Sequence, residues 1–214
     1  MEYFLNSEGG IIVNALTKTI KDNRGYLSDI DGIIGDGDHG ININKGFIIY
    51  EVKIGDRKLD LMTALKMIGE VLLIEIGGSV GPLYGTFFMN MSGACSGKEK
   101  IDKKVFFKML KAAIDGVQRL GNARVGDKTM VDTLAPAIEA YGKALKEGRS
   151  FVKALKGLKE AAENGKNSTI DMVAKIGRAS RLGKRSRGVL DAGAVSCNLI
   201  LQTMADAIIN LLDV

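Results

Sequence analysis

Three carboxylates stand within eight residues in the run Asp31-Gly-Ile-Ile-Gly-Asp36-Gly-Asp38-His39-Gly40. The glycines between them permit a tight backbone that can turn several carboxylate oxygens toward one point. Carboxylates crowded in this way repel one another, and a bound cation would relieve that repulsion. Mg²⁺ suits such a site, because it takes a few carboxylates together with water and phosphate oxygens. The structural alternative is an acidic turn that caps the following helix.

Other chemistries fit this run less well. Counting from Asp36 as the first ligand of an EF-hand loop puts Ile41 where that motif requires glycine. His39 is the only histidine, and Cys95 and Cys197 are far apart, so no zinc site is expected. No G-x-S-x-G segment is present to supply the nucleophile of a serine hydrolase.

Four further glycine-bearing segments precede or separate apolar runs. Glycines before a helix leave backbone N–H groups open to an anion, so each segment is a candidate phosphate cradle. The first of them, 77–82, is not a Walker A loop, because no glycine-lysine-serine/threonine run follows it. Together with the acidic loop, the four segments describe a nucleotide site ringed by helix ends. The four segments are 77–82 (GGSVGP), 126–132 (GDKTMVD), 177–180 (GRAS) and 191–194 (DAGA).

Each segment also has a purely structural interpretation. Thr129 and Asp132 have the spacing of a capping box at a helix start. Asp191 is placed to cap the last helix, where a carboxylate is favourable. Arg178 is placed to pair with a phosphate through its planar fork, or to lie in a solvated basic loop.

The spacing of apolar residues is helical along most of the chain, with no convincing alternating strand. We therefore expect an all-α fold, with 1–214 as a single domain. Gly121 is expected to end one helix as its C′ residue. The expected helices are 8–24, 39–54, 60–75, 81–94, 102–120, 130–147, 150–179 (with a possible break near Gly165) and 192–212.

The balance of charge alone does not identify a partner. The formal net charge is +5, but lysine and arginine are dispersed, with one dense cluster between Lys175 and Arg187. That cluster is either a solvated loop or an anion-binding and docking surface. No nucleic-acid-binding motif is present. Asp206 interrupts the C-terminal apolar run, so no membrane span is expected. With no CxxC pair and no signal-like N-terminus, a cytoplasmic protein is expected.

Four segments resemble the nucleotide-binding L subunit of dihydroxyacetone kinase, and they occur in the order of that family. The resemblance implies an eight-helix antiparallel up-and-down barrel with the nucleotide at one end, ADP or ATP as the nucleotide, and two Mg²⁺ ions. The segments are 31–46 (DGIIGDGDHGININKG), 77–88 (GGSVGPLYGTFF), 126–132 (GDKTMVD) and 177–196 (GRASRLGKRSRGVLDAGAVS).

The resemblance also implies roles for individual residues. Asp31, Asp36 and Asp38 would hold the metal ions and, with Arg178, act in phosphoryl transfer. Val80 stands where the family often has a second small hydroxyl residue, so a backbone N–H would replace that contact. The implied nucleotide-binding residues are His39, Gly40, Ile41, Asn42, Ser79, Val80, Gly121, Met130, Arg178, Asp191, Ala192 and Gly193.

The family works in two modes, with the L region either fused to a substrate-binding K domain or separate from it. The printed chain has no K region after Val214, so we expect the separate form. There, bound ADP would be recharged by an M-type phosphoryl donor of the phosphotransferase system, and dihydroxyacetone would be held on a K subunit. The alternatives are an ATP-dependent kinase for another short ketose or a carrier-bound substrate, and a non-catalytic nucleotide-binding regulator.

Overall fold

The computed structural model describes residues 2–212, which form helices and one short antiparallel sheet. In the sheet, Phe4 of β1 (Tyr3–Leu5) lies opposite Ile101 of β2 (Lys100–Asp102). Three short 3₁₀ helices are η1 (Asn6–Glu8), η2 (Thr169–Asp171) and η3 (Arg178–Ser186). The α-helices are α1 (Gly10–Asp22), α2 (Arg24–Ile34), α3 (His39–Ile54), α4 (Leu61–Glu75), α5 (Val80–Ala94), α6 (Lys103–Gly121), α7 (Val131–Lys146), α8 (Phe151–Ser168) and α9 (Ala192–Leu212).

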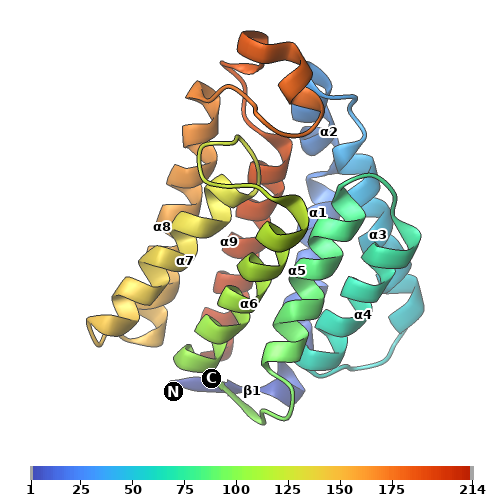
Figure 1. Ribbon diagram of the computed structural model, residues 1–214. Helices are drawn as coiled ribbons and strands as arrows, with labels where there is room; N and C mark the ends of the chain where they lie inside the picture. The colour runs from blue at the N-terminus through green and yellow to red at the C-terminus, as the bar shows by residue number, and fades with distance from the viewer. Residues whose placement is uncertain (1, 213–214) are drawn as a thin grey trace.

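The long helices run up and down in sequence order, and each packs against the next (Figure 1). The ring closes where α9 packs against α1. α2 follows α1 directly and extends it beyond the ring (Figure 1). The all-α fold predicted from the sequence is therefore confirmed, and α1 and α3–α9 correspond to the eight predicted helices.

Side-chain caps explain where several helices begin. Asp60 accepts a hydrogen bond from the N–H of Thr63 at 2.7 Å at the start of α4. Asp102 accepts from the N–H groups of Lys104 and Val105 at the start of α6. These bonds satisfy N–H groups that have no partner within the helix. α6 ends with a left-handed residue, as predicted, but that residue is Asn122 (φ 51°) and not Gly121.

Helices α7 and α8 approach closely because α8 presents a glycine to α7. A Cβ atom built on Gly165 would lie 2.3 Å from the carbonyl oxygen of Asp132 and 3.0 Å from the Cα of Thr133. No side chain larger than hydrogen fits at this position without moving one helix. The predicted break near Gly165 is therefore wrong, since the glycine serves close packing inside a continuous helix.

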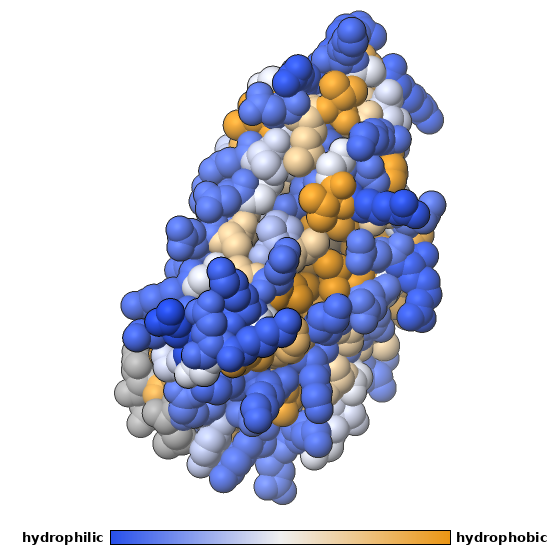
Figure 2. All heavy atoms as spheres, turned by 60° about the vertical axis from the view of Figure 1, so that its left-hand side comes forward, coloured by the Kyte–Doolittle hydropathy of each residue, from blue (hydrophilic) through white to orange (hydrophobic). Residues whose placement is uncertain are grey.

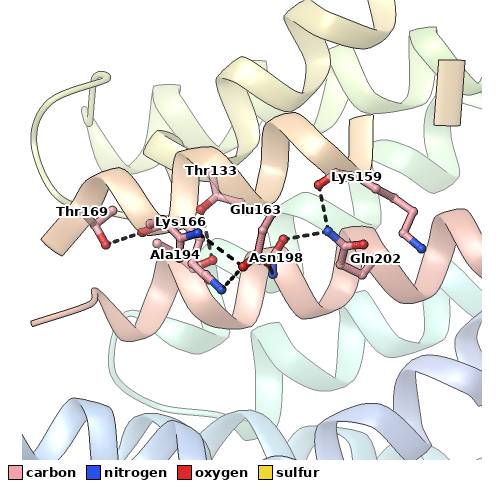
Figure 3. Close-up of polar contacts among 9 residues, drawn as sticks. Thr133, Lys159, Glu163, Lys166, Thr169, Ala194, Asn198 and Gln202 are labelled. Atoms are coloured by element: carbon pink, nitrogen blue, oxygen red, sulfur yellow. Dashed lines mark hydrogen bonds and ion pairs between the residues drawn. The ribbon is translucent and has the colours of Figure 1, made fainter. Parts of the chain in front are cut away.

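Helices α8 and α9 are joined by polar side chains (Figure 3). Asn198 donates a hydrogen bond to Glu163 at 2.8 Å, and Gln202 donates to the side-chain oxygen of Asn198 at 3.1 Å. Thr133 of α7 adds a bond to the carbonyl of Ala194 at 3.1 Å. These contacts fix the start of α9 against α7 and against the end of α8. The segment 169–191 connects α8 to α9 at this point.

Three further details differ from the sequence-based expectation. Helix α2 was not predicted, because Gly25 and Gly32 made its region resemble a loop. In the structure Leu27, Ile30 and Ile34 bury one face of that helix. Predicted helix 150–179 ends at Ser168, since the chain turns into η2 and then runs extended from Met172. The β1–β2 pair was also missed, because strands of three residues are too short to show alternation.

Helix α9 is long and apolar enough to cross a membrane by length and composition alone, so Asp206 is not the obstacle that the sequence suggested. More than half of its most apolar window is buried in the barrel, where α9 packs against α1, α7 and α8. On the face of the molecule that Figure 2 shows, polar and charged side chains cover most of the surface and surround a narrow apolar stripe. Helix α9 is thus a core helix of this fold.

Candidate nucleotide and metal site

Four loops meet at one end of the barrel, at the top of Figure 1, and the two ends of the described part of the chain lie at the bottom. They are the links between α2 and α3, α4 and α5, α6 and α7, and α8 and α9. The last link contains the basic loop, which we define as residues 172–189. The basic loop lies against α2, so segments that are far apart in sequence close over one space.

The three carboxylates that were expected to hold metal lie together here. Asp31 is on the last turn of α2, and Asp36 and Asp38 are in the loop that leads to α3. One oxygen atom of each lies within 4.8 Å of the others. A Cβ on residue 35 would lie 2.3 Å from Oδ1 of Asp31, so Gly35 makes room for that carboxylate. The set fits a divalent cation with oxygen ligands.

The alternative of a simple helix cap accounts for one of these carboxylates. Asp31 accepts a hydrogen bond from the N–H of His39, at the start of α3, at 3.2 Å. Asp38 is the N-cap residue of α3, but its side chain makes no capping bond. Asp36 pairs with Arg178 of the basic loop. Capping therefore leaves the clustering of Asp36 and Asp38 unexplained.

His39 is fixed by a short chain of hydroxyl groups. Its Nε2 lies 2.8 Å from the hydroxyl of Ser196, which lies 2.6 Å from the hydroxyl of Tyr84. Burial lowers the pKa of His39 to about 4, although the carboxylate of Asp31 acts in the opposite direction. The imidazole is therefore neutral at neutral pH and acts here as a hydrogen-bonding group.

The loop before α7 is held by Asp132. Its carboxylate accepts hydrogen bonds from the N–H groups of Gly126 at 2.5 Å and Thr129 at 2.7 Å. The bond from Thr129 is one arm of the predicted capping box, which is confirmed in that arm. In the other arm, the hydroxyl of Thr129 accepts from Val131 at 3.1 Å instead of from Asp132.

The last helix, α9, begins at Ala192, and Asp191 caps it as predicted. The carboxylate accepts a hydrogen bond from the N–H of Ala194 at 2.7 Å. Burial raises the pKa of Asp191 to about 7, while the bond to Ala194 and the charge of Lys128 act to lower it. A Cβ on Gly193 would lie 3.0 Å from the Asp191 carboxylate and 3.5 Å from the backbone nitrogen of Met130. The start of α9 thus lies against the loop before α7.

The loops enclose a polar cavity of about 210 Å³, beside an apolar cavity of about 270 Å³ that shares Ser79, Leu83, Thr129, Met130 and Ile176 with it. Gly121 lines only the apolar cavity, together with Pro82, Val117 and Leu120. The predicted residues that line the polar cavity are Asp31, Asp36, Asp38, His39, Asn42, Ser79, Val80, Met130, Arg178, Asp191, Ala192 and Gly193.

Two predicted residues line neither cavity. Gly40 is buried against α2, where a Cβ would lie 2.2 Å from the carbonyl oxygen of Arg24. The side chain of Ile41 is 47% exposed on the outer face of α3. Both lie next to His39 and Asn42, which do line the polar cavity, so any contribution from them would come through the backbone.

Sequence reasoning missed Lys128, Tyr84 and Ser196. Lys128 is 1% exposed, has a left-handed backbone (φ 63°) and donates from Nζ to three carbonyl groups. Burial lowers its pKa, while Asp191 and Asp171 act to raise it. The only signal in the sequence was its place between Asp127 and Thr129 in a glycine-bearing loop, which does not reveal burial.

The ring of helices and the loops gathered at one end define an all-helical barrel of the dihydroxyacetone kinase type. The crystal structure of the dihydroxyacetone kinase from C. freundii in complex with AMP-PNP and Mg²⁺ matches with a TM-score of 0.68 at 25% identity. The match covers 92% of this chain and 33% of that chain.

The chain belongs to the DAK2 domain family, whose pattern matches residues 33–206. It is 38% identical over 200 residues to the ADP-binding subunit DhaL of the PEP-dependent dihydroxyacetone kinase of Escherichia coli (strain K12), covering 91% of this chain and 94% of that protein. It is 32% identical to an L-erythrulose 1-kinase of Mycolicibacterium smegmatis, covering 91% of this chain and 34% of that protein. The family resemblance inferred from the four segments is confirmed, and the chain is a kinase-family protein.

Proposed function

We propose that this end of the barrel holds an adenine nucleotide with two Mg²⁺ ions, and that the chain transfers its terminal phosphoryl group. The observation that carries the proposal is the cluster of Asp31, Asp36 and Asp38 beside Arg178 in a cavity lined by helix starts. Metal ions would compensate the three carboxylates and the phosphate charge together. The ADP-binding relative and the structure with AMP-PNP and Mg²⁺ support a metal-bound nucleotide.

The two adjoining cavities suit the two halves of such a ligand. The apolar cavity between Leu83, Val117 and Leu120 would take the base, next to Gly121 and Met130. The phosphates would then extend over Ser79 and Val80 toward the carboxylates. Val80 begins α5, so free N–H groups and the positive end of that helix would face the phosphates of a bound nucleotide.

The chain's own residues would bind and orient the transferred group. Arg178 can exchange its ion pair with Asp36 for a phosphate oxygen and keep a planar, charged contact. Neutral His39 and Asn42 offer hydrogen bonds without adding charge. Bound Mg²⁺ would supply neutralisation of the charge that develops during transfer. None of these residues is placed as a covalent nucleophile for a ketose, so a partner has to hold the acceptor.

We propose that residues 1–214 act as one domain in the cytoplasm. We propose that this domain works with two partner proteins. One is a K subunit that presents dihydroxyacetone, and the other is an M-type protein that recharges bound ADP. Both need access to the same end of the barrel. The basic loop flanks that mouth with Arg178, Arg181 and Lys184, and it would steer acidic surfaces toward the nucleotide.

Reconstitution tests this function. The purified chain with ATP and dihydroxyacetone should show essentially no turnover, and activity should appear when a K subunit and a phosphorylated M-type donor are added. The rate should fall at high salt, because screening weakens the encounter. Lys184→Glu should slow the reconstituted reaction, whereas Lys146→Glu, on α7 away from the mouth, should not. Robust phosphorylation by the isolated chain with free ATP would show a self-sufficient kinase instead.

A second candidate acceptor is erythrulose, because one relative of this chain is named as an L-erythrulose 1-kinase. The acceptor would be chosen by the K region and not by this chain. The same chain combined with K subunits of either specificity should therefore follow the K subunit in its choice of ketose.

A further inference from the structure

The three ammonium hydrogens of Lys128 are matched by three backbone carbonyl oxygens. Nζ donates to the carbonyls of Thr169 at 2.7 Å, Met172 at 3.3 Å and Val189 at 2.5 Å. Lysine is almost never fully buried without such partners, because burying an unpaired charge is very costly. Three donors and three acceptors satisfy the group completely.

The acceptors stand at the two ends of the basic loop. Thr169 precedes the loop, Met172 begins it and Val189 ends it. One ammonium group therefore joins the two ends of the basic loop. Two further bonds close the same junction. The N–H of Gly188 donates to the carbonyl of Ile170 at 2.7 Å, and the N–H of Asp191 donates to the hydroxyl of Thr169 at 3.1 Å.

Lys128 also occupies a backbone conformation that disfavours a lysine. Its φ of 63° is left-handed, a region that glycine and asparagine adopt more readily. If the position needed only a turn, glycine would serve at lower cost. If it needed only to fill space, an apolar side chain would avoid burying a charge. What lysine adds is a rigid connection from the loop before α7 to both ends of the basic loop.

We propose that Lys128 is a positioning residue for Arg178. The proposal deepens the proposed function and rests on it. By holding both ends of the basic loop at a fixed separation, Lys128 limits the conformations of the loop, so Arg178 is held over the carboxylate cluster before a nucleotide binds. The hydrogen bond from the N–H of Lys175 to the carbonyl of Asp127 at 3.1 Å places the first part of the loop against the same segment.

A double-mutant cycle separates this role from a direct contact with the ligand. Lys128→Met keeps much of the side-chain length and removes the three donors, and it should weaken binding of Mg²⁺–ADP by about tenfold, as measured by calorimetry. In an Arg178→Ala background the same change should have an effect of less than about twofold, because there is no arginine left to position. Equal weakening in both backgrounds would overturn the proposal.

Lys103→Met is the matched control. Lys103 also donates to a backbone carbonyl, that of Arg149 at 2.9 Å, and pairs with Glu2, but it lies at the start of α6, away from the site. This variant should leave the affinity for Mg²⁺–ADP unchanged. Comparable weakening by Lys103→Met would mean that loss of a lysine anchor acts through general stability, which would also overturn the proposal.

A second measurement needs no nucleotide, so it distinguishes failure of this proposal from failure of the proposed function. Hydrogen exchange of the free protein should show slow amides at Gly188 and Asp191 and fast amides in the middle of the loop, near Arg181. Lys128→Met should speed exchange at Gly188 and Asp191, and it should expose the arginines of the loop to trypsin, while Tyr141 in α7 stays protected. Unchanged protection would overturn the proposal that Lys128 holds the two ends of the basic loop together.

If Lys128→Met does not fold, Lys128→Gln takes its place, because its shorter side chain keeps two N–H donors. The exchange pattern of the wild-type protein also tests the proposal without any variant. Uniformly fast exchange across 170–191 would show that the two ends of the basic loop are not held together.

Discussion

Asp36 has two competing partners in the proposed reaction. It pairs with Arg178 in the structure, and it is one of the three proposed metal ligands. A cation that binds the cluster would compete for the carboxylate and release the guanidinium toward a phosphate. The ion pair is largely exposed, so it costs little to exchange.

Replacement of Asp36 or Asp38 by alanine should abolish tight nucleotide binding. Each change removes an oxygen ligand and leaves phosphate charge uncompensated, so both variants should lose bound nucleotide, as measured by mass spectrometry of the denatured protein. Asp115→Ala, on the exposed face of α6, is the control. Wild-type levels of ADP and Mg²⁺ in both variants would disprove the assignment of the site.

Arg178→Lys should fold normally and transfer phosphoryl groups more slowly. Lysine keeps the charge but loses the planar fork, so a loss of about tenfold in kcat is expected. The melting temperature of the nucleotide-free protein should hardly change, because the side chain is exposed and its ion pair is screened. Unchanged turnover would mean that Arg178 is a solvated residue of the basic loop with no role in transfer.

At the scale of elements, the contact between α7 and α8 supports the site, because Asp132 and Thr133 of α7 face Gly165 of α8. Gly165→Ala would force a methyl group against the Asp132 carbonyl and should destabilise the protein by about 1–3 kcal/mol. Gly157→Ala, on the same helix, is a matched control because a Cβ there meets nothing within 4 Å. That change should stabilise by about 0.5–1 kcal/mol. Urea unfolding measures both, and equal effects would contradict the packing argument.

The helices that could be predicted from sequence are those whose apolar spacing is uninterrupted. Helix α2 was hidden because Gly25 and Gly32 suggest a loop in isolation, whereas packing on α3 overrides that local preference. The end of α8 was misplaced for the converse reason. Its helical spacing continues past Ser168, but Thr169 turns its hydroxyl back to the carbonyl of Lys166 and takes part in the junction with Lys128.

The residues of the candidate site also fall into two groups, those that the sequence reveals and those that it does not. Residue types that carry chemistry, such as Asp31, Asp36 and Asp38, stand out in a sequence and proved to lie together. The residues that support them do not stand out. A tyrosine on α5 and a serine on α9 resemble ordinary core residues until the fold places Tyr84 and Ser196 beside His39. The position of such contacts depends on how helices far apart in sequence pack.

For the whole molecule, bound nucleotide should stabilise the fold only when metal is present. A ligand that binds only the folded state adds about 2.7 kcal/mol at a concentration of a hundred times its Kd. Mg²⁺ with ADP should therefore raise the melting temperature, whereas ADP with a chelator should raise it much less, because the carboxylates repel the phosphates. Thermal melts with Mg²⁺ alone are the control. An equal shift with and without metal would contradict the proposed role of the cluster.

The closing of the ring between α1 and α9 has a consequence for the time at which the protein becomes functional. Most helices pack against their neighbours in sequence, so they can assemble in order as the chain leaves the ribosome. The contact between α1 and α9 joins the two ends of the described chain, so it can form only after α9 has been made. Because Asp191 to Gly193 at the start of α9 complete the wall of the polar cavity, a nascent chain that already contains all three carboxylates still has no finished pocket. On the proposed function, a nucleotide would stabilise only the completed barrel, and an unfinished chain would not hold it.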